Sequence, residues 1–109
     1  MLVTIFGSSN RERVLLFLHC REEGYAREIA RFFKTDLSQT QKQLERLETG
    51  GVLYSKAAGK TRIYLYNPRF PFLKELKWML EKMMIFLPEK EAENLRVIRK
   101  RPGYQEKTL

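Results

Sequence analysis

The chain has 109 residues, 43% hydrophobic and 31% charged, with a formal net charge of +8. This length allows one domain with a modest core, and the composition excludes a largely disordered chain. So large an excess of basic residues in so small a domain predicts a polyanionic partner, and we favour nucleic acid over an anionic membrane surface.

Cys20 is the only cysteine, so no internal disulfide can form and a reducing compartment is the simpler expectation. The apolar opening "MLVTIF" is too short for the core of a signal peptide. No later apolar run approaches the roughly 18 residues that a membrane span needs. The sequence therefore predicts a cytoplasmic protein that does not contact a membrane.

Two short helices are expected first. Ser9–Glu12 has the pattern of a capping box, and Gly24 ends the helix that follows it. The residues that this helix would turn toward a core are Val14, Leu15, Leu18 and Cys20. A second helix follows in "YAREIARFFK". Its apolar residues at helical spacing are Ala26, Ile29, Ala30 and Phe33.

A third helix is expected at about residues 38–49. Ser38 and Gln41 have the spacing of a second capping box, and the two glycines at 50 and 51 stop the helix. Its inner stripe consists of Thr40, Leu44 and Leu47. From residue 52 to 66 the pattern alternates on both sides of a glycine-bearing turn, which predicts a β-hairpin.

Three helices followed by a hairpin form a recognisable order, in which the second and third helices make a helix-turn-helix and the hairpin makes a wing. The third helix has long polar side chains outside its inner stripe, and the hairpin has cations with no acid between Val52 and Pro71. Glutamine and arginine match base edges in the major groove, whereas lysine and serine suit phosphate oxygens. The candidate DNA-binding residues are Ser38, Gln39, Gln41, Lys42, Gln43 and Arg46 on the helix, and Lys56, Lys60 and Arg62 on the wing.

The alternative is that this polar face is simply solvated, since glutamine and lysine are good helix formers. The cationic wing favours DNA, because a hairpin tip needs no cation to fold. Two rival functions remain: a protein-binding winged-helix adaptor whose basic face is incidental, and RNA binding. RNA binding is disfavoured because the wing tyrosines alternate and are expected to pack rather than to form a stacking platform.

A long C-terminal helix is expected at about residues 71–87, with more apolar surface than a small core can cover. Such a surplus predicts a homodimer interface. The assigned interface residues are Phe72, Leu73, Leu76, Met79, Leu80, Met83, Met84 and Leu87. The alternative is that the terminal segment, through Leu95 and Ile98, folds back over the surplus. We expect one domain over residues 1–101 and a flexible tail at 102–109. Two alternatives stay open for the basic cluster Arg96–Arg101: contact with DNA beyond the wing, or a solvated surface.

The stretches "REIAR", "LSQTQKQLERLETGGVL" and "GKTRIYLYNP" resemble small prokaryotic winged helix-turn-helix regulators of the ArsR-like group. The resemblance extends from about Phe6 to Leu87. It implies a homodimer that binds a two-fold operator in double-stranded DNA, usually as a repressor. It does not indicate which operator is bound, or which effector or protein partner is recognised.

Metal-sensing members of that group carry clustered ligands, but here His19 and Cys20 are the only imidazole and thiol. Neighbouring helical residues diverge by about 100°, so we expect no metal site, and a packed Cys20 beside an exposed His19. A lone histidine also provides no catalytic Ser/His/Asp set, and no phosphate-binding glycine motif is present. The sequence therefore predicts no enzyme activity and no cofactor.

Overall fold

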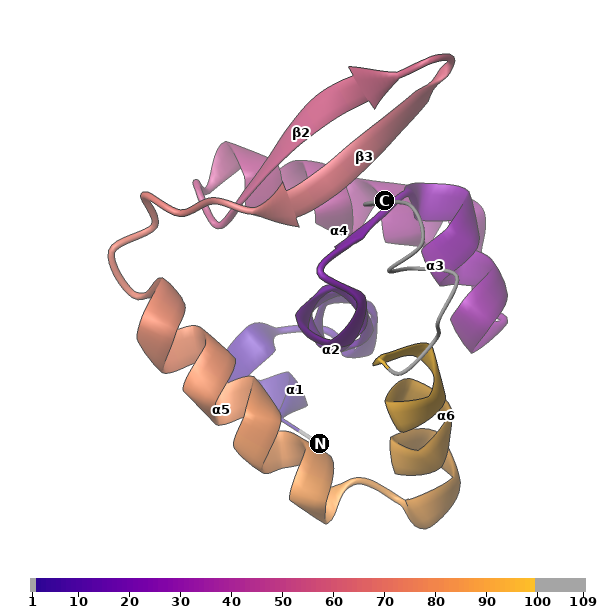
Figure 1. The fold of residues 1–109 in the computed structure, drawn as a ribbon, viewed down its shortest axis with the longest axis vertical. Helices are drawn as coiled ribbons and strands as arrows, with labels where there is room; N and C mark the ends of the chain where they lie inside the picture. Colours follow the sequence, from indigo (N-terminus) through magenta and orange to yellow (C-terminus); the bar gives the residue numbers. More distant parts are fainter. Residues whose placement is uncertain (1, 100–109) are drawn as a thin grey trace, which may run out of the picture.

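The computed structural model describes residues 2–99 of the chain (Figure 1). Its elements in chain order are α1 (Val3–Phe6), α2 (Ser9–Arg21), β1 (Glu23–Gly24), α3 (Ala26–Phe33), α4 (Leu37–Thr49), β2 (Leu53–Ala58), β3 (Thr61–Tyr66), α5 (Leu73–Phe86) and α6 (Glu89–Arg99). This confirms the predicted fold class, mainly α with a small β-hairpin. The expected tail at 102–109 and the end of the basic cluster lie outside the described residues.

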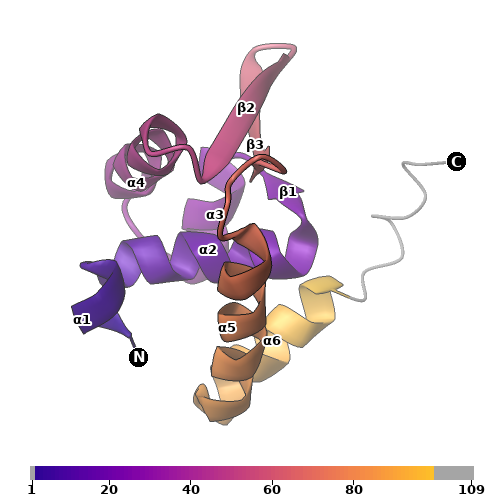
Figure 2. The ribbon, with the colours of Figure 1, turned by 90° about the vertical axis from the view of Figure 1, so that its left-hand side faces the viewer.

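Helix α2 runs through the middle of the fold, with the hairpin on one side of it and α5 and α6 on the other (Figures 1 and 2). The five consecutive residues from Val14 to Leu18 are buried, and so is Cys20. A helix that is apolar on all sides needs neighbours on all sides, which α1, α4, α5 and α6 supply. The core positions predicted on this helix are confirmed, and Leu16 and Phe17 add to them.

The N-terminus of α2 differs by one residue from the expected capping box. Ser8, not Ser9, is the N-cap, and its hydroxyl accepts a hydrogen bond of 2.9 Å from the Arg11 backbone N–H. The Glu12 carboxylate accepts instead from the backbone N–H of Leu2, at 2.7 Å. Glu12 therefore ties the N-terminal segment down rather than closing a capping box.

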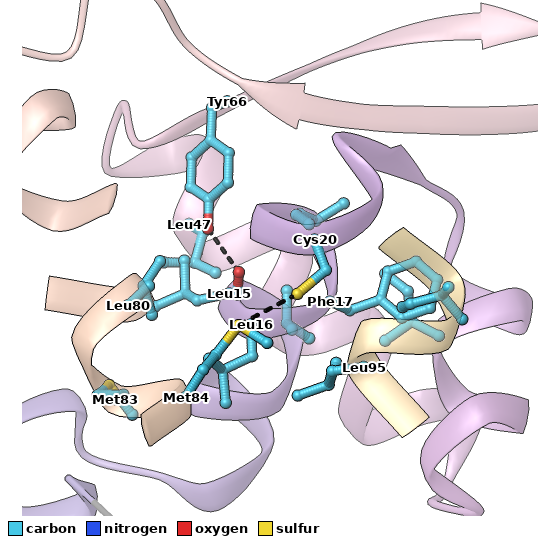
Figure 3. Packing of buried hydrophobic residues seen from close by; sticks show 14 of the residues in the cluster. Leu15, Leu16, Phe17, Cys20, Leu47, Tyr66, Leu80, Met83, Met84 and Leu95 are labelled. Atoms are coloured by element: carbon cyan, nitrogen blue, oxygen red, sulfur yellow. Dashed lines mark hydrogen bonds between the residues drawn. The ribbon is translucent and has the colours of Figure 1, made fainter. Parts of the chain in front are cut away.

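The sheet has the strand order β1-β3-β2, with both pairs antiparallel. The hairpin turn consists of the two residues between Ala58 and Thr61, and Gly59 has the positive φ that such a turn requires (65°). Tyr64 and Tyr66 are buried, and the Tyr66 hydroxyl donates to the Leu15 carbonyl oxygen at 2.7 Å (Figure 3). Packing of these two tyrosines, as expected, anchors the base of the hairpin to α2. The expectation is wrong for Tyr54, which lies on the opposite face of the hairpin and is 39% exposed.

Helix α6 folds back from Pro88 and packs against α2, burying Ala92, Leu95 and Ile98. Figure 3 shows Leu80, Met83 and Met84 of α5 and Leu95 of α6 around the buried residues of α2. The interface assignment made from the sequence is therefore wrong for four residues, which lie inside the protomer: Leu80, Met83, Met84 and Leu87. The reason is that this side of α5 packs against α2. The terminal segment does fold back, as the alternative had it, but it packs against α2 and reaches α5 through Arg99.

A polar cluster joins α2, α5 and α6 at the edge of this core. Arg99 Nη2 donates to Glu81 Oε1 at 2.9 Å, and His19 Nε2 lies 2.8 Å from the same oxygen. The His19 side chain is only 11% exposed, so the expectation of an exposed histidine is wrong. Cys20 is buried as expected, and burial raises the pKa of its thiol. No group of three or more His, Cys, Asp or Glu side chains within residues 2–99 is arranged to hold a metal ion.

The Arg99 and His19 hydrogen bonds lower the pKa of Glu81 from 4.5 to about 2. Because the folded-state pKa lies below the unfolded value, the stabilisation is complete above about pH 4.5 and is lost as the pH falls toward 2. Glu81→Gln is expected to reduce the free energy of unfolding near neutral pH by about 1 kcal/mol or less, since the side chain is half-exposed. Urea unfolding across this pH range should show the difference shrinking on acidification.

Glu93→Gln is a suitable control, because Glu93 accepts from the Arg96 side chain in an exposed ion pair within α6. This substitution should change the free energy of unfolding by a smaller amount. A difference in the free energy of unfolding between wild type and Glu81→Gln that stays constant down to about pH 2 would contradict the assigned role of the carboxylate.

Within residues 2–99, no helix is both long and apolar enough to cross a membrane.

Candidate nucleic-acid interface

The turn between α3 and α4 sets the direction in which α4 leaves the core. Lys34 ends α3 with a left-handed backbone (φ 56°), and the Thr35 N–H donates to the Ala30 carbonyl oxygen at 2.9 Å. Asp36 then caps α4 by accepting from the Gln39 backbone N–H. The capping box expected at Ser38 is wrong: the Ser38 hydroxyl instead donates to the Asp36 carboxylate at 2.6 Å.

One side of α4 faces solvent and carries the polar residues expected there. Ser38, Gln39, Lys42 and Arg46 are exposed, and Gln41 is half-buried, donating from its amide to Glu45 Oε2 at 3.2 Å. The opposite side is the predicted inner stripe, with Thr40, Leu44 and Leu47 buried. Figure 2 shows α4 beside the base of the projecting hairpin. This arrangement leaves the N-terminal half of α4 accessible to a large ligand.

Gln43 departs from this arrangement. It is 4% exposed, and its Oε1 accepts from Arg11 Nε at 2.9 Å, so it cannot reach a base edge. Arg11 also donates from Nη1 to the Phe6 carbonyl oxygen at 2.7 Å, which joins α4 to α1 and α2. The helical period explains this burial, because positions 40, 43, 44 and 47 form one i, i+3, i+4, i+7 stripe on the inner side of α4. Gln43 is therefore a structural residue, and its assignment to DNA contact is corrected.

The three wing cations are exposed but do not share one face of the hairpin. Arg62 pairs across the strands with Ala57, on the face that carries buried Tyr64, whereas Lys56 pairs with Ile63 on the opposite face. Arg62 Nη1 donates to the Ser55 hydroxyl at 3.0 Å, and this hydroxyl donates to Glu48 Oε2 of α4 at 2.7 Å. Arg62 is thus tied toward α4, while Lys56 points away from it and Lys60 lies in the turn.

A groove of about 270 Å³ runs between the start of α3, α4 and the wing. The polar residues that line it are Tyr25, Arg27, Gln41, Lys60, Thr61 and Arg62. Three of these are cations, and they come from two elements that are far apart in the sequence. The groove therefore brings Arg27 and Gln41 together with the wing cations in one basic surface.

Arg27 is the functional candidate that the sequence analysis missed. It lies in the first turn of α3, is exposed, and lines the groove together with Lys60 and Arg62. Its position inside "REIAR" was noted there for the family resemblance alone. A cation in the first helical turn, away from the apolar stripe of α3, was the available signal, but only the fold shows that it faces the wing.

No protein-family model and no curated protein sequence matches this chain. Solved structures do match. A MarR-family transcriptional regulator from Silicibacter pomeroyi superposes with a TM-score of 0.59 at 16% identity, covering 97% of this chain and 68% of that one. The chain has a winged helix-turn-helix fold.

Two further structures agree with the winged helix-turn-helix assignment. The apo form of the C30AH42A mutant of Lactococcus lactis ZitR has a TM-score of 0.56 at 21% identity, covering 98% of this chain and 83% of that one. The transcriptional regulator Tm0710 from Thermotoga maritima has a TM-score of 0.55 at 16% identity, covering 99% and 83%. At these identities the similarity shows the fold, a coarser assignment than the ArsR-like group that the sequence resembles.

Proposed function

We propose that this protein is a sequence-specific double-stranded DNA-binding transcription regulator that acts as a homodimer. Helix α4 enters the major groove, and the wing contacts the flanking backbone or the minor groove. The observation that carries the proposal is the single basic surface formed by the exposed side of α4 and the groove beside the wing. The net charge of +8 and the similarity to solved transcriptional regulators support it.

Each exposed residue has a chemical role in this proposal. Gln39 and Arg46 read base edges, because their paired hydrogen-bonding groups match those of the bases. Ser38 and Lys42 contact phosphates close to the N-terminal half of α4. Gln41 joins the base-reading set once its bond to Glu45 is exchanged for one to DNA. The phosphate-binding residues around the groove are Arg27, Lys60 and Arg62, with Lys56 on the outer face of the wing.

The dimer is supported by apolar surface that stays exposed on α5 although its inner side packs against α2. Phe72, Trp78, Ile85 and Phe86 are each more than 60% exposed. A soluble protein seldom leaves such a patch uncovered. Of the interface residues assigned from the sequence, Phe72 is exposed, and Leu73, Leu76 and Met79 are partly exposed. The ArsR-like resemblance favours repression of transcription in a prokaryotic cytoplasm.

Selection of bound sites from random duplex DNA tests this function. We expect enrichment of sites that contain two inverted half-sites, with centres about one helical turn or a multiple of it apart, because a two-fold protein presents two copies of α4. Competition with random duplex at moderate salt serves as the control for nonspecific binding. Equal binding to all sequences would contradict sequence-specific recognition. No binding even at low salt would favour the protein-binding adaptor.

A further inference from the structure

The outward side of α5 has a regular arrangement of apolar and charged residues. Trp78 and Ile85 lie two turns apart on it and are 74% and 76% exposed, and Phe72 and Phe86 are exposed at the two ends of the helix. Glu75 and Lys82 are also exposed and lie two turns apart on the same side. Within residues 2–99, nothing covers this surface, which we call the outer face of α5.

Two hollows on the outer face have the shape that a facing helix requires. One, of about 470 Å³, is lined by Lys74, Glu75, Trp78, Met79 and Lys82. The other, of about 410 Å³, is lined by Trp78, Glu81, Lys82 and Ile85. Positions 75, 78, 79 and 82 form an i, i+3, i+4, i+7 set, and so do 78, 81, 82 and 85. Four residues with this spacing form the hole into which one side chain of a facing helix inserts.

Helix α5 and the α5 of a second copy could pair about a two-fold axis in a parallel or an antiparallel direction. The charges on the outer face decide between these two pairings. A parallel pair would place Glu75 opposite Glu75 and Lys82 opposite Lys82, which opposes like charges twice. An antiparallel pair centred between Trp78 and Met79 places Glu75 opposite Lys82 twice. The same register puts Trp78 opposite Met79 and Phe72 opposite Ile85. Charge and apolar surface are thus both self-complementary in the antiparallel pair alone.

We infer that the outer face of α5 binds the same face of a second copy of this chain in an antiparallel pair, in which Trp78 fills the hole between Glu75 and Lys82 of the other copy and each Glu75 pairs with the other copy's Lys82. The inference depends on the homodimer of the proposed function but not on DNA binding. Glu81 takes no part in this pairing, since Arg99 and His19 of its own chain occupy its carboxylate.

Charge exchange tests the orientation through sedimentation equilibrium of the full chain without DNA. Glu75→Lys and Lys82→Glu each replace two attractive contacts with two repulsive ones, so each should raise the dimer dissociation constant by about tenfold at low salt. The double variant Glu75→Lys/Lys82→Glu restores both pairs and should return to within about threefold of wild type. Glu91→Lys and Lys90→Glu on exposed positions of α6 are the matched controls and should leave the dissociation constant unchanged.

Three outcomes would overturn the inference. A chain that sediments as a monomer at about tens of micromolar would show that no second copy binds. Single variants that do not weaken the dimer would indicate a parallel pair, in which each variant only exchanges one like-charge contact for another. A double variant that adds the losses of the two singles would show that Glu75 and Lys82 do not face each other. A wild-type chain that dimerises but binds no duplex DNA would count against the proposed function instead.

Discussion

Leu80→Ala is expected to lower the free energy of unfolding by about 2–5 kcal/mol, the usual cost of removing a large aliphatic side chain from a core. Leu80 has no exposed surface and lies on the inner side of α5, facing the buried residues of α2 (Figure 3). Because no partner can touch it, the dimer dissociation constant should not change. Urea unfolding measures the first quantity, and sedimentation equilibrium measures the second.

Trp78→Ala is the control on the same helix. Trp78 is 74% exposed, so its removal should cost the protomer little stability but should weaken association of the two copies. Leu80→Ala is therefore expected to lower the stability of the protomer without weakening the dimer, and Trp78→Ala is expected to do the reverse. A Leu80→Ala variant with wild-type stability and a weakened dimer would mean that the inner and outer faces of α5 are wrongly assigned.

Gln39→Ala is expected to weaken binding to the selected DNA site by about 1–3 kcal/mol and to relax the base preference at the contacted position. Gln39 is exposed on the first turn of α4, and the Asp36 cap binds its backbone N–H, not its side chain. Binding to random duplex should change little, since nonspecific binding depends on phosphate contacts. Mobility shifts on cognate and random duplex measure both affinities.

Two other substitutions separate residues that read bases from a residue that only supports the fold and from one that contacts phosphates. Gln43→Ala removes a buried acceptor for Arg11, so it should lower the free energy of unfolding by about 1 kcal/mol without changing base preference. Lys60→Ala should weaken cognate and random duplex alike and reduce the salt dependence of binding by about one charge. Equal losses on cognate and random DNA for Gln39→Ala would contradict its role in reading bases.

Local patterns predicted α4 and the hairpin well, because the residues that form them carry both the period and the stop signals. Thr40, Leu44 and Leu47 at helical spacing, followed by two glycines, were enough to place the helix. The assignment of Gln43 failed although the same period places it inside. A polar side chain was taken as evidence of exposure, whereas Arg11, 32 residues earlier, satisfies it within the fold.

Helix α5 shows where local pattern was insufficient. Apolar residues occur on two sides of it, and the hydrophobic effect is not directional, so the sequence could not say which side meets the core and which remains free. The packing of α5 against α2 made the choice and buried Leu80, Met83 and Met84. The side that had been assigned to a partner became core in four of its eight residues, whereas Phe72 of that set and Trp78, Ile85 and Phe86 outside it are exposed.

By itself, the sequence determined the order from α2 to α5 apart from strand β1, the basic character of the protein and the polar side of α4, because each depends on residues close together in the chain. Tertiary structure alone decided that Arg27 faces the wing across a groove, that Gln43 is internal and that Trp78 and Ile85 are free. These outcomes depend on contacts between distant segments. Such contacts are set by how whole faces of helices pack, which no short stretch of sequence specifies.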